Sequence, residues 1–155
     1  MIHIRKILYP TDFSSFATPA YFHAVAMAEA HHASLTIAYV FQESGSDERS
    51  PSEERTYWRN QLESISPADS KIAVNHVLLE GDAATEIIRY TRDAGIDLIV
   101  MGTHGRTGAE RLLVGSVTEK VMREAPCSVL AVKLPRNHTT TPTPDLSIPA
   151  ERGKV

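Results

Sequence analysis

The sequence predicts an open α/β fold in which two layers of helices enclose a five-stranded parallel sheet, a three-layer sandwich. Five short apolar segments alternate with four segments of helical periodicity along 155 residues. Strands that alternate with long helices pair in parallel through crossover connections. The run Leu98 to Met101 is wholly apolar, as in a strand buried on both faces. With 42% apolar and 23% charged residues, the chain reads as one globular domain.

The first strand is expected over Ile7 to Tyr9 and ends at Pro10. A helix follows from Ala17, where small and apolar residues recur at helical spacing. Its start stays open between three caps, namely Ser14, Ser15, or Thr18 with Pro19 in the first helical position.

The second strand is predicted over Ser34 to Phe41, and a polar loop over residues 42–49 follows it. Ser50-Pro51-Ser52-Glu53 predicts the start of the second helix twice, by a capping box and by proline at the first position. The expected buried stripe of this helix consists of Trp58, Leu62 and Ile65. The helix is expected to stop at Pro67.

The remaining elements follow the same alternation. Asp82 is expected to cap the third helix and Gly95 to end it. Around that helix the sequence predicts strands over 72–80 and 98–102, then a helix over 116–124 and a strand over 128–134.

A glycine-rich stretch links the fourth strand to the fourth helix. Gly102, Gly105 and Gly108 permit close approach of the backbone to a ligand and tolerate positive φ. The helix that follows presents N–H groups without intrahelical partners and the positive end of its dipole. Such a loop is suited to hold phosphate without a lysine.

Ser116 has a second interpretation. Ser116-x-x-Glu119 matches a capping box, in which both side chains satisfy free N–H groups of the helix. Capping accounts for these two residues but not for Gly115 before them or for the earlier glycines. The combined pattern therefore favours phosphate binding.

Two motifs resemble the universal stress protein family. Gly102-x2-Gly105-x9-Gly115-Ser116 is similar to the ATP-binding signature of that family, and the opening segment 7–14 is similar to its first strand and acidic turn. The resemblance covers roughly residues 2 to 134. It implies a Rossmann-like fold of the adenine nucleotide alpha hydrolase-like type, with strand order 3-2-1-4-5.

With that order, the ligand crevice lies between the first and fourth strands, where the order reverses. Asp12 then faces the main-chain amides around Gly102, Gly105 and Gly115. The resemblance implies a nucleoside end and a phosphate end. The nucleotide-binding residues are expected to be Pro10, Thr11, Asp12, Val40, Met101, Gly102, His104, Gly105, Arg106, Gly115, Ser116, Val117 and Thr118.

Two side chains of the loop have alternative interpretations. Arg106 is suited to pair bidentately with phosphate oxygens, or it is a solvated loop arginine. His104 either donates a hydrogen bond to a phosphate oxygen or simply faces water. Asp12 by itself also reads as a turn residue or a helix cap.

The function expected from these residues is ATP binding by a regulatory protein, with slow or no hydrolysis. The P-loop pattern with its lysine does not occur in the sequence, and nothing identifies a base beside an attacking water, so no catalytic residue is assigned. Mg²⁺ is a possible companion of the nucleotide, and the histidines show no metal spacing. The alternatives are a slow nucleotide hydrolase or transferase using the same cleft, and a nucleotide-free interaction protein.

Partners and location follow from the remaining sequence. Val129, Leu130, Ala131 and Val132 form an apolar edge strand, and the resemblance implies a homodimer through it. A net charge of −3 without a basic cluster argues against nucleic acid. The sequence shows no signal peptide and no apolar run long enough to cross a membrane, so a cytoplasmic protein is expected. Cys127 is expected to be a buried, inert thiol.

Domain organisation is simple. Residues 1–135 are expected to form the nucleotide-binding domain. Residues 136–155 contain a Thr-Pro run without periodicity and are expected to form a disordered tail.

Overall fold

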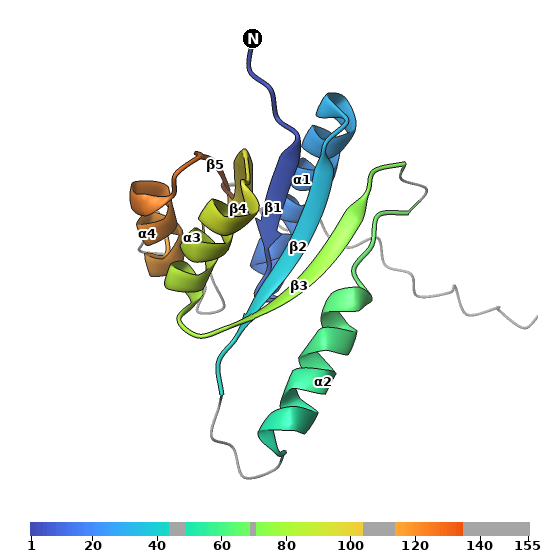
Figure 1. Cartoon of the computed structure of the whole chain (residues 1–155), viewed down its shortest axis with the longest axis vertical. Helices are drawn as coiled ribbons and strands as arrows, with labels where there is room; N and C mark the ends of the chain where they lie inside the picture. Colours follow the sequence, from blue (N-terminus) through green and yellow to red (C-terminus); the bar gives the residue numbers. More distant parts are fainter. Residues whose placement is uncertain (44–48, 69–70, 104–113, 135–155) are drawn as a thin grey trace, which may run out of the picture.

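The computed structural model describes residues 1–43, 49–68, 71–103 and 114–134 of the chain. Within them, five strands form one parallel sheet in the order β3-β2-β1-β4-β5, which confirms the expected fold and strand order (Figure 1). The strands are β1 (Lys6–Pro10), β2 (Ser34–Phe41), β3 (Val74–Glu80), β4 (Leu98–Gly102) and β5 (Ser128–Val132). The helices are η1 (Ser15–Ala17), α1 (Thr18–His31), α2 (Pro51–Glu63), α3 (Ala83–Ala94) and α4 (Ser116–Glu124).

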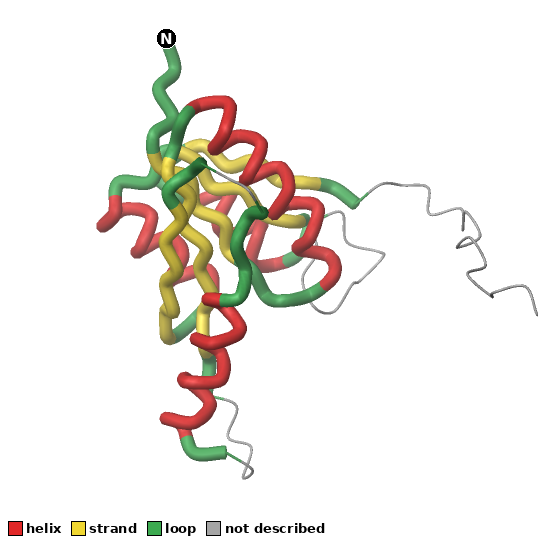
Figure 2. Tube along the Cα trace, turned by 90° about the vertical axis from the view of Figure 1, so that its right-hand side faces the viewer, coloured by secondary structure: helices red, strands yellow, loops and turns green. Residues whose placement is uncertain are grey.

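Both faces of the sheet are covered by helices (Figures 1 and 2). In β1, Ile7 and Tyr9 belong to the core under α1 and α2, whereas Leu8 belongs to the core under α3 and α4. Successive side chains of a strand point to opposite faces, so one apolar run supplies both cores. This is the physical reason that the central strands β1, β2 and β4 are largely apolar without alternation.

The helix α1 packs closely on the sheet through three fully buried alanines, Ala20, Ala24 and Ala28, which lie one turn apart. None of the three expected caps begins it. Its N-cap is Ala17, without a side-chain hydrogen bond, because the short helix η1 runs directly into α1 and supplies the preceding turn.

The helix α2 begins with the expected capping box. The Ser50 hydroxyl accepts from the Glu53 N–H, and the Glu53 carboxylate accepts from the Ser50 N–H. Leu62 is buried, but Ile65 lies beyond the end of the helix. Its carbonyl oxygen is 2.6 Å from Nε2 of His76 on β3, so this segment is tied to the sheet after the helix has ended.

The helix α3 has the expected ends, with Asp82 as N-cap and Gly95 in the left-handed conformation as C-cap. The strands β3 and β5 are shorter than predicted because each extends only as far as its pairing with its neighbour. The pairing of β3 with β2 begins at Val74, and that of β5 with β4 ends at Val132.

No helix among the described residues is long and apolar enough to cross a membrane. The expectations for residues 44–48 and 135–155 fall outside the described residues.

Candidate functional site

A cleft opens at the carboxyl ends of the strands, where the strand order reverses. Its lining includes ten of the residues expected to bind nucleotide, namely Pro10, Thr11, Asp12, Val40, Met101, Gly102, Gly115, Ser116, Val117 and Thr118. These residues lie at the carboxyl ends of β1, β2 and β4, directly after β1, or at the start of α4. Because β1 is the middle strand, Asp12 lies between the carboxyl ends of β2 and β4. The other three expected residues, His104, Gly105 and Arg106, lie outside the described residues.

The cleft is also lined by four residues that the sequence analysis did not predict, namely Ala17, Tyr39, Ala83 and Ile87. Ala83 and Ile87 begin α3, directly after the carboxyl end of β3. All parallel strands end at the same edge, so the turn capped by Asp82 was a sequence signal that α3 would approach the site. Ala17 and Tyr39 carry no such signal, because both belong to the core on the other face of the sheet.

The acidic turn after β1 is held by its own side chains. Oδ1 of Asp12 accepts from the Ser14 N–H (2.9 Å) and from the Ser14 hydroxyl (2.5 Å). The Thr11 hydroxyl accepts from the Phe13 N–H (3.1 Å), and the Thr11 N–H donates to the Ala38 carbonyl (2.8 Å). Local bonds of this kind define a tight turn. The turn interpretation of Asp12 is thus correct, and the same residue lines the cleft.

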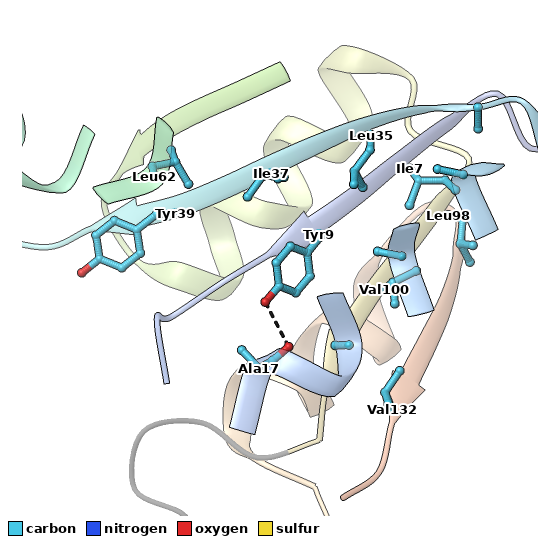
Figure 3. Packing of buried hydrophobic residues seen from close by; sticks show 14 of the residues in the cluster. Ile7, Tyr9, Ala17, Leu35, Ile37, Tyr39, Leu62, Leu98, Val100 and Val132 are labelled. Carbon is cyan, nitrogen blue, oxygen red and sulfur yellow. Dashed lines mark hydrogen bonds between the residues drawn. The ribbon is translucent and has the colours of Figure 1, made fainter. Parts of the chain in front are cut away.

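A buried tyrosine of β1 forms a hydrogen bond with the short helix that follows the turn. The Tyr9 hydroxyl donates to the carbonyl oxygen of Ala17, 3.0 Å away (Figure 3). Desolvation by burial raises the pKa of Tyr9 to about 12, and the nearby charge of Asp12 acts in the same direction. The phenol therefore stays protonated at neutral pH and remains a donor that holds η1 against β1.

The ends of the glycine loop are joined. The Gly115 N–H donates to the Thr103 carbonyl, and the Thr103 N–H donates to the Val132 carbonyl (3.1 Å). The Thr118 hydroxyl donates to the Gly102 carbonyl (2.8 Å). The chain therefore leaves β4 and enters α4 at nearly the same point, whatever the path of residues 104–113.

The Gly115 N–H is used in this junction, so it is not one of the amides around Gly115 that are left for a ligand. Positive φ is not required there either, because Gly115 has φ −69°. The described glycines with positive φ are Gly81 and Gly95, so Gly102 does not adopt it. What the two site glycines provide is the absence of a side chain at the cleft wall.

The capping box predicted at Ser116 is wrong. Gly115 is the N-cap, its carbonyl accepts from the Glu119 N–H, and no side chain caps the helix. The helix spans Ser116–Glu124 as predicted, so Ser116 is its first helical residue and not the residue before the helix that would cap it. The amino terminus of α4 therefore keeps orphan N–H groups at Ser116, Val117 and Thr118, all of which line the cleft.

Titratable groups are few around the cleft. Among its described lining residues, Asp12 carries the only carboxylate, and no lysine, arginine or histidine is present. The described residues contain no group of three or more side chains arranged to hold a metal ion. The site thus offers a carboxylate, main-chain amides and apolar walls, which suits binding of a polar anionic ligand with a flat apolar part.

The predicted edge strand and cysteine lie away from this cleft. In β5, Val129, Leu130 and Ala131 are half-buried, and Val132 is 7% exposed. Cys127 is half-buried rather than buried, and desolvation raises the pKa of its thiol, so it is mainly protonated at neutral pH.

Comparison with known proteins shows that this sequence is similar to universal stress proteins. Universal stress protein MJ0531 of Methanocaldococcus jannaschii is 34% identical, over 85% of this chain and 84% of that protein. Universal stress protein MJ0577 of the same organism is 30% identical, over 83% of this chain and 94% of that protein.

Solved structures agree with the fold. Universal stress protein UspA from Lactobacillus plantarum matches with a TM-score of 0.68 and 27% identity, over 84% of this chain and 98% of that chain. A universal stress protein in complex with cAMP matches with a TM-score of 0.65 and 21% identity, over 84% and 98% of the two chains. The model of the Universal stress protein family matches residues 3–133. The chain belongs to the universal stress protein family.

Proposed function

We propose that this chain binds an adenine nucleotide, ATP in particular, and acts as a nucleotide-dependent regulatory module of the stress response with slow or no hydrolysis. One observation carries the proposal: a single cleft joins the acidic turn after β1 to the uncapped amino terminus of α4. A carboxylate and a set of orphan amides are the two polar elements that a nucleoside polyphosphate needs.

The nucleoside occupies the side of the cleft near β2 and α3. Val40, Ala83 and Ile87 supply apolar surface there, and Met101 at the end of β4 adds to it. Such walls suit the faces of a purine ring, since ligand sites combine apolar lining with a few directed polar groups. Asp12 follows the middle strand, where its carboxylate accepts hydrogen bonds from a ribose hydroxyl or the adenine amino group.

The phosphates occupy the side near β4 and α4. The N–H groups of Ser116, Val117 and Thr118 donate to phosphate oxygens, and the helix dipole adds a favourable field. Glycine at 102 and 115 leaves space for the phosphate chain. His104, Gly105 and Arg106 complete the phosphate end in this proposal, with Arg106 as the side-chain cation and Mg²⁺ as a companion ion of the phosphates.

The proposal of slow hydrolysis is supported by the residues that line the described part of the cleft. Asp12 is its one carboxylate, and Oδ1 of that group already accepts two hydrogen bonds from Ser14. A general base must reach the attacking water in the bound complex. The bound state, rather than the product, is then the signal. The fold relative solved with cAMP is compatible with an adenine ligand, but its 21% identity shows the fold alone, so the proposal depends on the residues of this cleft.

The proposal also includes a cytoplasmic location and a homodimer through β5. That strand forms one edge of the described sheet, and an apolar edge is protected when a second copy pairs with it. Two-fold pairing of this kind closes on itself. The cleft lies at the carboxyl ends of the strands, so both sites of the dimer stay open.

The first test is titration calorimetry of the full chain with ATP, ADP and AMP, together with mass spectrometry of any nucleotide that copurifies. Gly115→Val should reduce ATP affinity at least about tenfold. Valine adopts φ −69° without strain, but its side chain occupies the phosphate end. Ala26→Val is a matched control on the exposed side of α1 and should bind like the wild type.

Two results would overturn the proposal. One is the absence of both binding heat and copurified adenine nucleotide in the wild-type protein. The other is unchanged affinity in Gly115→Val, which would place the phosphates elsewhere. Rapid multiple turnover that is lost in Asp12→Ala would instead identify an enzyme.

A further inference from the structure

The acidic turn carries a feature that the proposed function does not use. Phe13 follows Asp12 directly and adopts φ 60°, in the left-handed region that is unfavourable for a bulky side chain. Strained residues persist where surrounding structure holds them, and they cluster at functional sites. The question is therefore what holds Phe13 and what depends on it.

Two aromatic rings, those of Trp58 and Tyr39, hold Phe13. The Phe13 ring stacks on Trp58 of α2, with centroids 5.3 Å apart and planes 20° apart. The Tyr39 ring lies 4.8 Å from Phe13 and 4.9 Å from Trp58. Each ring thus contacts the other two, and the set joins the turn after β1, the strand β2 and the helix α2.

The three rings occupy different positions relative to the cleft. Tyr39 lines the cleft, as do Thr11 and Asp12, whereas Phe13 and Trp58 do not belong to its lining. Phe13 and Trp58 pack instead against the core under α1 and α2. The turn therefore has one side toward the cleft and one side toward α2.

Hydrogen bonds from main-chain N–H groups to side chains of the same turn connect its two sides. The Phe13 N–H donates to the Thr11 hydroxyl, and the Ser14 N–H donates to the Asp12 carboxylate. Rotation of the Phe13 backbone out of the left-handed region would break the first bond and redirect Asp12. Stacking against Trp58 is the contact that opposes this rotation.

We infer that Phe13 is a positioning residue for nucleotide binding, and that its stack on Trp58 couples occupancy of the cleft to the placement of α2. The inference rests on the proposed function, since it concerns the regulation of that same site. Coupling is reciprocal: α2 stabilises the turn that binds the nucleotide, and the nucleotide stabilises α2 in its present place. The amino-terminal half of α2 projects beyond the sheet (Figure 1). A change in the placement of α2 would therefore alter the surface that the protein presents to a partner.

The test uses the single tryptophan of the chain as a reporter. ATP should change the Trp58 fluorescence of the wild-type protein in a saturable way, with the same affinity as calorimetry gives. Trp58 does not line the cleft, so direct contact with the ligand does not produce this signal. Unchanged emission at saturating ATP would overturn the inference.

Two substitutions separate the ring from the backbone. Phe13→Gly relieves the unfavourable φ but removes the stack, so it should weaken ATP binding about tenfold and abolish the fluorescence response. Phe13→Tyr keeps the ring and should retain both. Phe22→Ala removes an aromatic ring that is 64% exposed on α1 and is the matched control, with wild-type affinity and response.

The outcomes distinguish this inference from the proposed function. Wild-type affinity in Phe13→Gly would overturn the inference and leave ATP binding intact. Failure of the wild-type protein to bind ATP would remove both. Circular dichroism of each variant verifies folding, and unchanged wild-type emission at saturating ATP would overturn the inference even if Phe13→Gly does not fold.

Discussion

Thr118 shows how a single hydroxyl joins two motifs that are sixteen residues apart in the chain. Its side chain is 4% exposed and donates to the carbonyl of Gly102, so the end of β4 and the first turn of α4 are fixed relative to each other. The sequence placed Thr118 among the ligand-binding residues. The structure adds a structural role that no local pattern indicates, because the bond spans the whole glycine loop.

Thr118→Val tests that role. Valine has nearly the same shape but no donor, so the Gly102 carbonyl loses its partner in a part-buried position. We expect the free energy of unfolding to fall by about 1–2 kcal/mol, measured by urea denaturation. Thr56→Val is the matched control, because Thr56 donates to the Ser52 carbonyl on the exposed face of α2, where water replaces the bond. An equal loss in the two variants would contradict the role assigned to Thr118.

Among the secondary-structure elements, the helix N-termini show where sequence patterns predict the structure correctly. Ser50 and Asp82 cap α2 and α3 as predicted, because each stands directly after a loop and its oxygen reaches the third residue onward. At α1 and α4 equally good residues do not cap. There the preceding backbone is placed by η1 and by the bond between Gly115 and Thr103, which are set by contacts outside the helix.

Asp82 makes the stability of α3 depend on pH. Hydrogen bonds from the hydroxyl and the N–H of Thr85 lower the pKa of its carboxyl below the ordinary value of 3.8. When folding lowers the pKa of a carboxyl, the ionised group stabilises the folded protein at pH values above the pKa of the unfolded chain. This stabilisation is lost as the pH falls through the pKa of the folded protein. Asp82→Ala should therefore cost about 1 kcal/mol at pH 7, or about 3 °C in Tm.

The difference in Tm between wild type and Asp82→Ala should shrink in acid below about pH 3.8. Asp82→Asn is the control, since asparagine caps helices without a charge and should keep most of the stability at both pH values. A wild-type advantage over Asp82→Ala that is undiminished in acid would show that the cap does not act through the carboxylate.

For the whole molecule, the proposed dimer depends on the free side of β5. The Val132 carbonyl faces β4, because it accepts from the Thr103 N–H. The N–H and C=O of one strand residue point the same way and alternate along the strand, so those of Ala131 point outward, away from β4. Proline is tolerated at such edge positions, where its missing N–H affects only pairing with another chain.

Ala131→Pro should consequently convert the dimer to a monomer at micromolar concentration, measured by light scattering, without loss of the fold by circular dichroism. Met122→Ala removes an exposed apolar side chain from α4 and should leave the dimer unchanged. A monomeric wild-type protein, or a dimeric Ala131→Pro, would contradict pairing through this strand.

The sequence by itself determined the order and type of the main elements, two N-caps and one C-cap of the helices, and the family. These depend on interactions within a few residues or on a long spaced motif that is read directly, such as the apolar run at 98–101 or Ser50 to Glu53. It also named ten of the described cleft residues, because their positions follow from the carboxyl ends of predicted strands.

Only the tertiary structure decided what each of those residues does beside its neighbours. The pairing of the Gly115 amide with Thr103, the bond from Thr118 to Gly102, and the stack of Phe13 on Trp58 all join segments far apart in the chain. Such contacts arise when helices pack on a sheet whose twist and strand order bring distant residues together. A local pattern records a residue's own preference, and these contacts override it.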